Sequence, residues 1–185
     1  SVAKIKWAIG HEPPKSRVAA LCFDKLDVEK GMEVRDPDGD VRWLRYPWSV
    51  LAYQLAGDKG LQLLHAEGLN AERESAPAEN LLTDLLSLPA ADGMGTLILI
   101  DEVLMFAREK VALDRSWLDK LTNFFQYLTQ AAAKVDRCCI VASLLATDPK
   151  KSDTFGKELL GDLYGIFQRQ REAAVEPVVK EDVAE

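Results

Sequence analysis

The chain has 185 residues and a net charge of −7, with 48% hydrophobic and 29% charged residues, which is typical of a soluble globular domain and excludes a largely disordered chain. No apolar run approaches the roughly 20 residues that span a bilayer, so a membrane-spanning protein is excluded. The acidic balance argues against a nucleic-acid binder that relies on bulk charge. Three cysteines (Cys22, Cys138 and Cys139) without a CxxC pair favour neither a disulfide framework nor a zinc site. We therefore expect one domain, residues 1–185, in a reducing cytoplasmic compartment with no membrane contact.

The first quarter of the chain contains an apolar run and a turn. Residues 18–23 are apolar and uncharged and end at Asp24, a pattern typical of a strand buried on both faces. Residues 36–40, Asp-Pro-Asp-Gly-Asp, form a strong turn signal. The alternating residues 41–46 that follow predict a small ribbon with the residues before the turn.

Several helices are then predicted. Pro47 can open a helix that Gly57 closes, and a second short helix is expected to end at Gly68. Residues 77–88 carry leucines on one helical face. The longest helix is expected over residues 116–135 with Ser116 and Asp119 as a capping box, and a last amphipathic helix over residues 152–173.

Two further apolar runs predict strands. One is residues 96–100, which lead directly into Asp101 and Glu102, and the other is residues 138–146. On a strand, Cys138 and Cys139 would point to opposite faces and have packing roles. Buried strands that alternate with helices indicate an α/β fold, a three-layer parallel sheet with crossover helices.

The adjacent acids suggest chemistry, because active groups of open parallel sheets lie at the carboxyl ends of the strands. Asp101 could hold Mg²⁺ directly or through water, and Glu102 could polarise a water for attack on a phosphoryl group. This pattern resembles a Walker B motif. The alternative is that Asp101 caps the helix that follows.

Polar residues near the next strand and the last helix add candidates. Ser143 or Thr147 could sense a nucleotide γ-phosphate, and each could equally be a buried hydroxyl bonded to backbone. Arg169 or Arg171 could reach the nucleotide of a neighbouring subunit and stabilise transition-state charge. Alternatively, these arginines are a solvated helix end favoured by the helix dipole.

A phosphate-binding loop is missing. Residues 10–16, Gly-His-Glu-Pro-Pro-Lys-Ser, lack the second glycine of GxxxxGK[ST] and are one residue short. Pro13 and Pro14 also remove N–H donors that a phosphate nest requires. Other conspicuous residues are interpreted as packing residues: His11 and His65 lack the spacing of a metal site or triad, and Trp43 and Trp48 are expected to anchor the core.

Three stretches together resemble a family of AAA+-like P-loop ATPases, long filed as a domain of unknown function and found beside DNA methyltransferases in prokaryotic phage-defence loci. Residues 46–57 resemble its Trp-Gly-x-x-Ala-x-Gln-Leu-Gly-Gly signature, with Trp48 and Gln54 among the agreeing residues, and Ser49 and Ala56 standing where the family favours glycine. Residues 75–86 resemble the helix that follows, and residues 97–110 its Walker B strand and helix. Residues 138–148 and 169–178 fit the sensor strand and the arginine segment less specifically.

The resemblance implies a partial NTPase core whose first strand, P-loop and lid lie outside this chain. ATP and Mg²⁺ would be the cofactors of the full-length protein, which would act as a homo-oligomer with a DNA methyltransferase or other defence proteins as possible partners. The isolated chain should then bind nucleotide weakly or not at all. The alternative is a non-catalytic interaction domain on a degenerate P-loop scaffold. A metal nuclease would need further acids and a lysine that the sequence does not provide.

Overall fold

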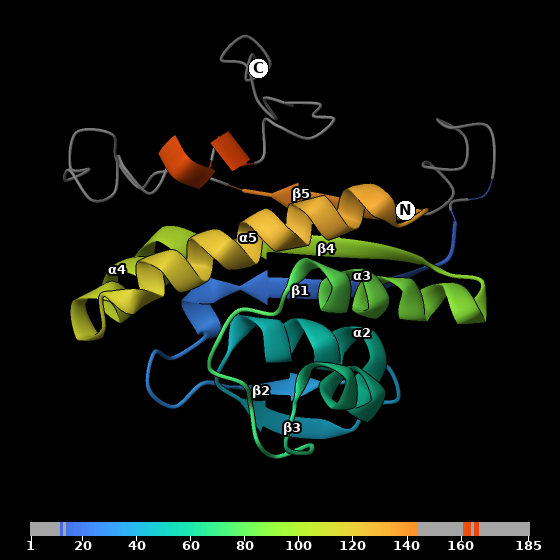
Figure 1. Ribbon diagram of the computed structural model, residues 1–185. Helices are drawn as coiled ribbons and strands as arrows, with labels where there is room; N and C mark the ends of the chain where they lie inside the picture. Colours follow the sequence, from blue (N-terminus) through green and yellow to red (C-terminus); the bar gives the residue numbers. More distant parts are fainter. Residues whose placement is uncertain (1–11, 13, 144–160, 164, 167–185) are drawn as a thin grey trace, which may run out of the picture.

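The computed structural model describes residues 12, 14–143, 161–163 and 165–166. Its centre is a parallel sheet of three strands in the order β1-β4-β5, where β1 is Ser16–Cys22, β4 is Gly95–Asp101 and β5 is Cys138–Ala142 (Figure 1). All three carboxyl ends therefore meet at one edge, and the predicted α/β class with a parallel sheet is confirmed.

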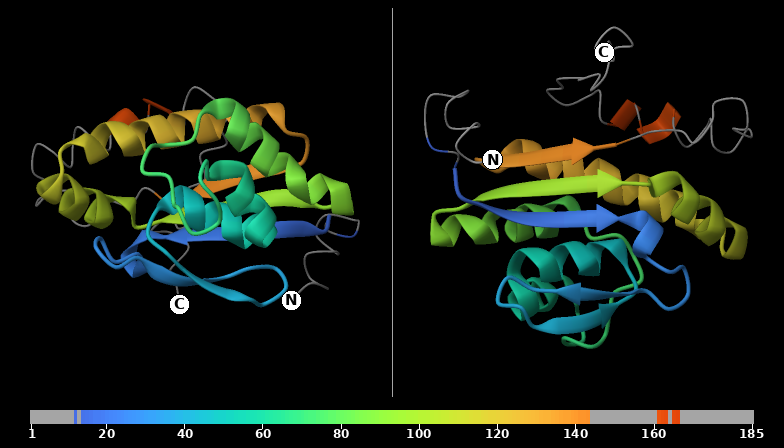
Figure 2. Two further views of the ribbon diagram at one scale, coloured as in Figure 1. Left: turned by 60° about the horizontal axis from the view of Figure 1, so that its bottom comes forward. Right: turned by 180° about the vertical axis from the view of Figure 1, so that it is seen from behind.

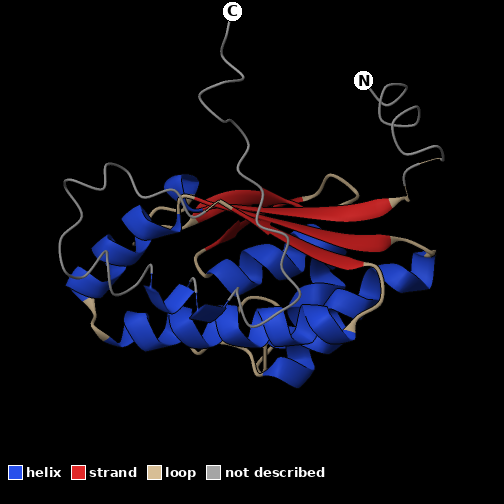
Figure 3. Cartoon of the chain, turned by 90° about the horizontal axis from the view of Figure 1, so that it is seen from above, coloured by secondary structure: helices blue, strands red, loops and turns tan. Residues whose placement is uncertain are grey.

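The helices form a second layer on one face of this sheet. They are α2 (Pro47–Leu64), α3 (Glu79–Ser87), α4 (Val103–Leu113) and α5 (Ser116–Lys134), with short 3₁₀ helices η1 (Phe23–Lys25) and η2 (Leu88–Asp92). Figure 3 shows the strands as one layer and these helices beneath it. The chain moves across the sheet in one direction, and right-handed crossovers that run in one direction cover the same face. No helix of the described part of the chain is long and apolar enough to cross a membrane.

The opposite face of the sheet carries apolar side chains that the described residues leave uncovered. Val18 on β1 is 50% exposed, Leu99 on β4 38% and Val141 on β5 54%. The right-hand view of Figure 2 shows this face towards the reader, with no described helix in front of the strands. The strand predicted over residues 18–23 is confirmed as part of β1, but the expectation that both of its faces are buried is wrong. The expected third layer is not among the described residues.

The predicted ribbon is confirmed as an antiparallel hairpin of β2 (Met32–Arg35) and β3 (Val41–Leu44). Its turn is held by Asp36, whose carboxylate accepts the backbone N–H groups of Asp38 and Asp40 at 2.9 Å each. Trp43 lies on the outer side of the ribbon and is 58% exposed, so the prediction that it anchors the core is wrong. Its indole N–H donates to the carbonyl of Lys30.

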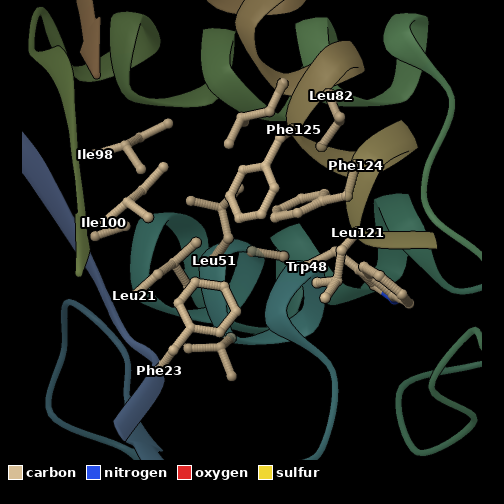
Figure 4. Close-up of a cluster of buried hydrophobic side chains, with 14 of the residues drawn as sticks. Leu21, Phe23, Trp48, Leu51, Leu82, Ile98, Ile100, Leu121, Phe124 and Phe125 are labelled. Atoms are coloured by element: carbon tan, nitrogen blue, oxygen red, sulfur yellow. The ribbon is translucent and has the colours of Figure 1, made fainter. Parts of the chain in front are cut away.

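The core lies between the sheet and the helices. Figure 4 shows Ile98 and Ile100 of β4 facing Phe124, Phe125 and other side chains of the helical layer. Trp48 is fully buried, as predicted, and its indole N–H donates to the carbonyl of Arg73 at 2.8 Å. Leu163 and Ile166, from the predicted last helix, are also buried in this core; the rest of that helix lies almost entirely outside the described residues.

Helix boundaries follow the predicted signals with two exceptions. Gly57 has φ 57° and ψ −140° inside α2, so it breaks the helix where predicted, but the second half ends at Leu64 rather than near Gly68. The capping box is wrong because the N-cap of α5 is Arg115, and Ser116 instead donates its hydroxyl to Asp114.

Candidate active site at the carboxyl edge of the sheet

Asp101 and Glu102 lie where the central strand ends. The residues of β4 that face the helices, such as Ile98 and Ile100, are buried and fix the strand, whereas Asp101 and Glu102 are exposed. Only Glu102 separates β4 from α4, so the chain turns sharply here. Both carboxylates are thus presented to solvent at the edge of a rigid sheet, as the sequence predicts.

The turn is made by an unusual backbone conformation at Glu102. Its φ is 57° and ψ 34°, the left-handed region that a residue with a side chain seldom adopts. The carboxylate of Asp101 accepts the N–H of Glu102 at 3.0 Å, which stabilises this turn. Such conformations cost about 1–3 kcal/mol and concentrate at functional sites.

This geometry bears on the alternative role of Asp101 as a helix cap. The N-cap residue of α4 is Glu102, and no side-chain capping hydrogen bond is made there. A capping carboxylate would accept an N–H from the second or third helical residue. The bond of Asp101 to Glu102 lies before the helix, so the capping role is not supported.

Ser143 is the third predicted site residue that the structure brings to this edge, after Asp101 and Glu102. Ile100 pairs with Ala142, and the N–H of Ser143 donates to the carbonyl of Ile100 at 2.8 Å, which continues the β4–β5 ladder by one residue. Ser143 is half-buried and follows β5 directly. Thr147, Arg169 and Arg171 lie outside the described residues, so the choice between Ser143 and Thr147 and that between the two arginines stay open.

The carboxyl edge also includes residues to which sequence reasoning assigned no role. Cys22 pairs with Asp101 in the β1–β4 register, and η1 begins directly after it, with the exposed Asp24. Asp24 could have been predicted from the same sequence pattern as Asp101, because each is an acidic residue that directly follows an apolar run. Among the described residues, however, no three His, Cys, Asp or Glu side chains form a group that could hold a metal ion.

Among the described residues, the carboxylates at this edge therefore suit a metal ion that takes only one or two ligands from the protein. Mg²⁺ is commonly bound by one or two carboxylates together with substrate phosphates and water, rather than by a cage of protein ligands. Asp101 fits that pattern, whereas a nuclease-type site with several acids does not fit the described residues.

The segment around Trp48, at the start of α2, is part of the scaffold. Gln54 projects from α2 to β1, where its side-chain oxygen accepts the N–H of Ala20 at 2.6 Å and its amide nitrogen donates to the carbonyl of Ala20 at 3.2 Å. Together with the burial of Trp48, this contact fixes α2 against the sheet. These two residues position the fold rather than contribute groups to the carboxyl edge.

Comparisons with known proteins do not identify a family or a function for this chain. A scan against protein-family models, a search of curated proteins and a search of solved structures each found no match.

Proposed function

We propose that this chain is part of an ATP-binding and ATP-hydrolysing AAA+-like module and carries its Walker B strand. The supporting observation is the pair of exposed acids, Asp101 and Glu102, at the carboxyl end of the central strand of a parallel sheet. Ligands of open α/β sheets bind outside the carboxyl ends of the strands. The strained turn at Glu102 and the lack of a capping bond from Asp101 also favour a chemical role.

In this proposal each residue has a distinct role. Asp101 holds Mg²⁺ directly or through water, and the metal neutralises charge on the phosphates. Glu102 orients and polarises the attacking water. Ser143 is the polar residue of the neighbouring strand that contacts the γ-phosphate, with Thr147 as the alternative. Arg169 or Arg171 stabilises the transition state in a neighbouring subunit, which requires a homo-oligomer.

The biological setting is proposed from the family resemblance alone. The module would remodel or translocate a substrate in a DNA modification or phage-defence system in the cytoplasm, together with a DNA methyltransferase or other defence proteins. The sequence has no GxxxxGK[ST] loop to hold phosphates. We therefore expect the 185-residue chain alone to bind Mg·ATP more weakly than micromolar in calorimetry.

The test is ATP hydrolysis by the full-length natural protein and its Glu102→Gln variant. The variant should bind Mg·ATP like the wild type but lose hydrolysis by about 10²-fold or more, because the glutamine cannot accept a proton from water. Glu109→Gln is the matched control, since Glu109 is an exposed acid of the same helix, α4, beyond its first turn. Full activity of Glu102→Gln would disprove the assignment.

A second candidate function, a non-catalytic interaction domain, is favoured by the uncovered sheet face. Parallel sheets normally have both faces covered, yet Val18, Leu99 and Val141 are exposed here. If neither the wild type nor Glu102→Gln binds or hydrolyses ATP, the acids are structural and this second function replaces the first.

A further inference from the structure

The outer edge of β1 presents unpaired backbone groups. The carbonyl of Lys15 accepts the N–H of Gly95 at 2.8 Å, so the odd-numbered residues of β1 direct their backbone groups towards β4. The even-numbered residues face away, as the two bonds between Ala20 and Gln54 also require. Ser16 and Val18 therefore direct their N–H and C=O groups to the outer side, where no strand of the described chain pairs with them.

A groove runs beside this part of the edge. It has a volume of about 400 Å³ and is lined by β1, by Gln54 of α2 and by the hairpin turn (Ser16, Arg17, Val18, Ala20, Arg35, Asp36, Pro37 and Gln54). Figure 1 shows β1 as the strand of the sheet nearest to the hairpin. Gln54 occupies the place of a neighbouring strand at Ala20, and the stretch of edge beside the groove, with Ser16 and Val18, lies on the amino-terminal side of that residue.

We propose that a short extended segment of a partner protein docks in this groove and adds to β1 as an antiparallel strand, pairing with Ser16 and Val18. An exposed edge of this kind is a template for strand addition, in which main-chain hydrogen bonds provide the affinity. Nothing in this inference depends on the ATPase proposal, because none of the groove residues belongs to the carboxyl edge.

The position of Val18 defines the chemistry of the partner segment. A residue opposite Val18 places its side chain on the same sheet face, beside Val18 and its neighbour Leu97 on β4. That face is apolar, so the central residue of the partner is apolar and β-branched. The residues on either side of it point into the groove towards the polar groups of Arg35, Asp36 and Gln54, so they are polar.

The probe for the test is the pentapeptide acetyl-Thr-Thr-Val-Thr-Thr-amide, titrated into the ¹⁵N-labelled intact chain and followed by NMR. We expect saturable shifts of the Ser16 and Val18 amide signals at millimolar peptide, because so short a peptide buries little surface. In an antiparallel pair the central valine exchanges both hydrogen bonds with Val18, so the same peptide with an N-methyl group on that valine loses a backbone donor and should bind about tenfold more weakly or worse. Equal binding of both peptides, or no shift at these amides, would disprove strand addition.

Two variants of the chain add a matched comparison. Val18→Pro removes an N–H that faces outward together with the valine side chain, but no bond to β4, so the β1–β4 ladder stays intact and peptide binding should fall about tenfold or more. Val141→Thr, on the same sheet face but on β5, should bind like the wild type.

Two further outcomes would also overturn the proposal of a partner protein. If the peptide binds only after residues 1–11 are deleted, the groove is occupied by the chain itself. If sedimentation detects a dimer of the wild type that Val18→Pro dissociates, the occupant is a second copy.

Discussion

The hydroxyl of Ser49 lies 3.2 Å from Nε2 of His65, and both side chains are buried. The other ring nitrogen of His65, Nδ1, lies 3.2 Å from the carbonyl of Leu69. Because a carbonyl can only accept, Nδ1 carries a proton, and in the neutral imidazole Nε2 then accepts a hydrogen bond from the hydroxyl of Ser49. The pair thus joins the first turn of α2 to the loop that follows the helix, which agrees with the packing role predicted for His65.

This pair predicts a measurable coupling energy. Ser49→Ala should lower the free energy of unfolding by about 1–3 kcal/mol, because it leaves a buried nitrogen of His65 without a donor. A double-mutant cycle with His65→Ala in urea denaturation should give a coupling of about 0.5–3 kcal/mol. Additive effects of the two substitutions would contradict the hydrogen bond.

The contact of Gln54 with the edge of β1 predicts a graded series. Gln54→Ala leaves both the N–H and the C=O of Ala20 without this partner and should destabilise the fold by about 1–3 kcal/mol. Gln54→Glu keeps the acceptor for the N–H but loses the donor to the carbonyl. Its carboxylate also faces an acceptor, so we expect it to be destabilising as well. Chemical denaturation measures both, and wild-type stability of Gln54→Ala would show that water replaces the amide without loss.

Gly60 predicts a steric effect within α2. A Cβ added there would lie 2.3 Å from the carbonyl oxygen of Ala52 across the kink at Gly57, so the two halves of the helix could not pack as they do. Gly60→Ala should cost about 1–3 kcal/mol despite the higher helix propensity of alanine. Gly161→Ala is the control, since Gly161 is helical and has open space around its α-carbon, and it should be neutral or stabilising by up to about 1 kcal/mol. Similar thermal shifts for both variants would contradict this prediction.

The vicinal cysteines should react at very different rates. As predicted, they lie on opposite faces of β5: Cys139 is exposed, and Cys138 packs against the core. Burial raises the pKa of Cys138 from 9.0 to about 11, with a smaller contribution from Cys139. Because the thiolate is the reactive form, iodoacetamide at pH 8 should modify Cys139 first and Cys138 only slowly, as peptide mass spectrometry would measure.

The same shift predicts the direction of a pH effect on stability. The unfolded chain loses the proton of Cys138 near pH 9 and the folded chain only near pH 11. The stabilisation is therefore fully present below pH 9 and is lost as the pH rises through about 11. Cys138→Ala should flatten the fall in stability over this window, and an unchanged pH profile would contradict the assignment.

The sequence alone determined most of the local structure. The apolar run before Asp101, the turn of residues 36–40, Pro47 and Gly57 are signals that depend on neighbouring residues, and each one predicted its element correctly. The same local pattern placed Asp101 and Glu102 at a strand end. Because strands that alternate with helices are joined by crossovers, which make the strands parallel, the parallel sheet could also be predicted.

Only the tertiary structure decided which surfaces are covered and which side chains meet. Trp43 and Trp48 are alike in sequence terms, yet one lies on the outer side of a ribbon and the other in the core, because burial depends on what packs against an element. The partners Ser49 and His65, or Ala20 and Gln54, are separated by 16 and 34 residues, and no local pattern encodes such pairs. The uncovered sheet face also depends on the tertiary structure. The apolar sequences of β1 and β4 are typical of strands that are buried on both faces. The direction of the crossovers, however, places every described helix on the same face of the sheet.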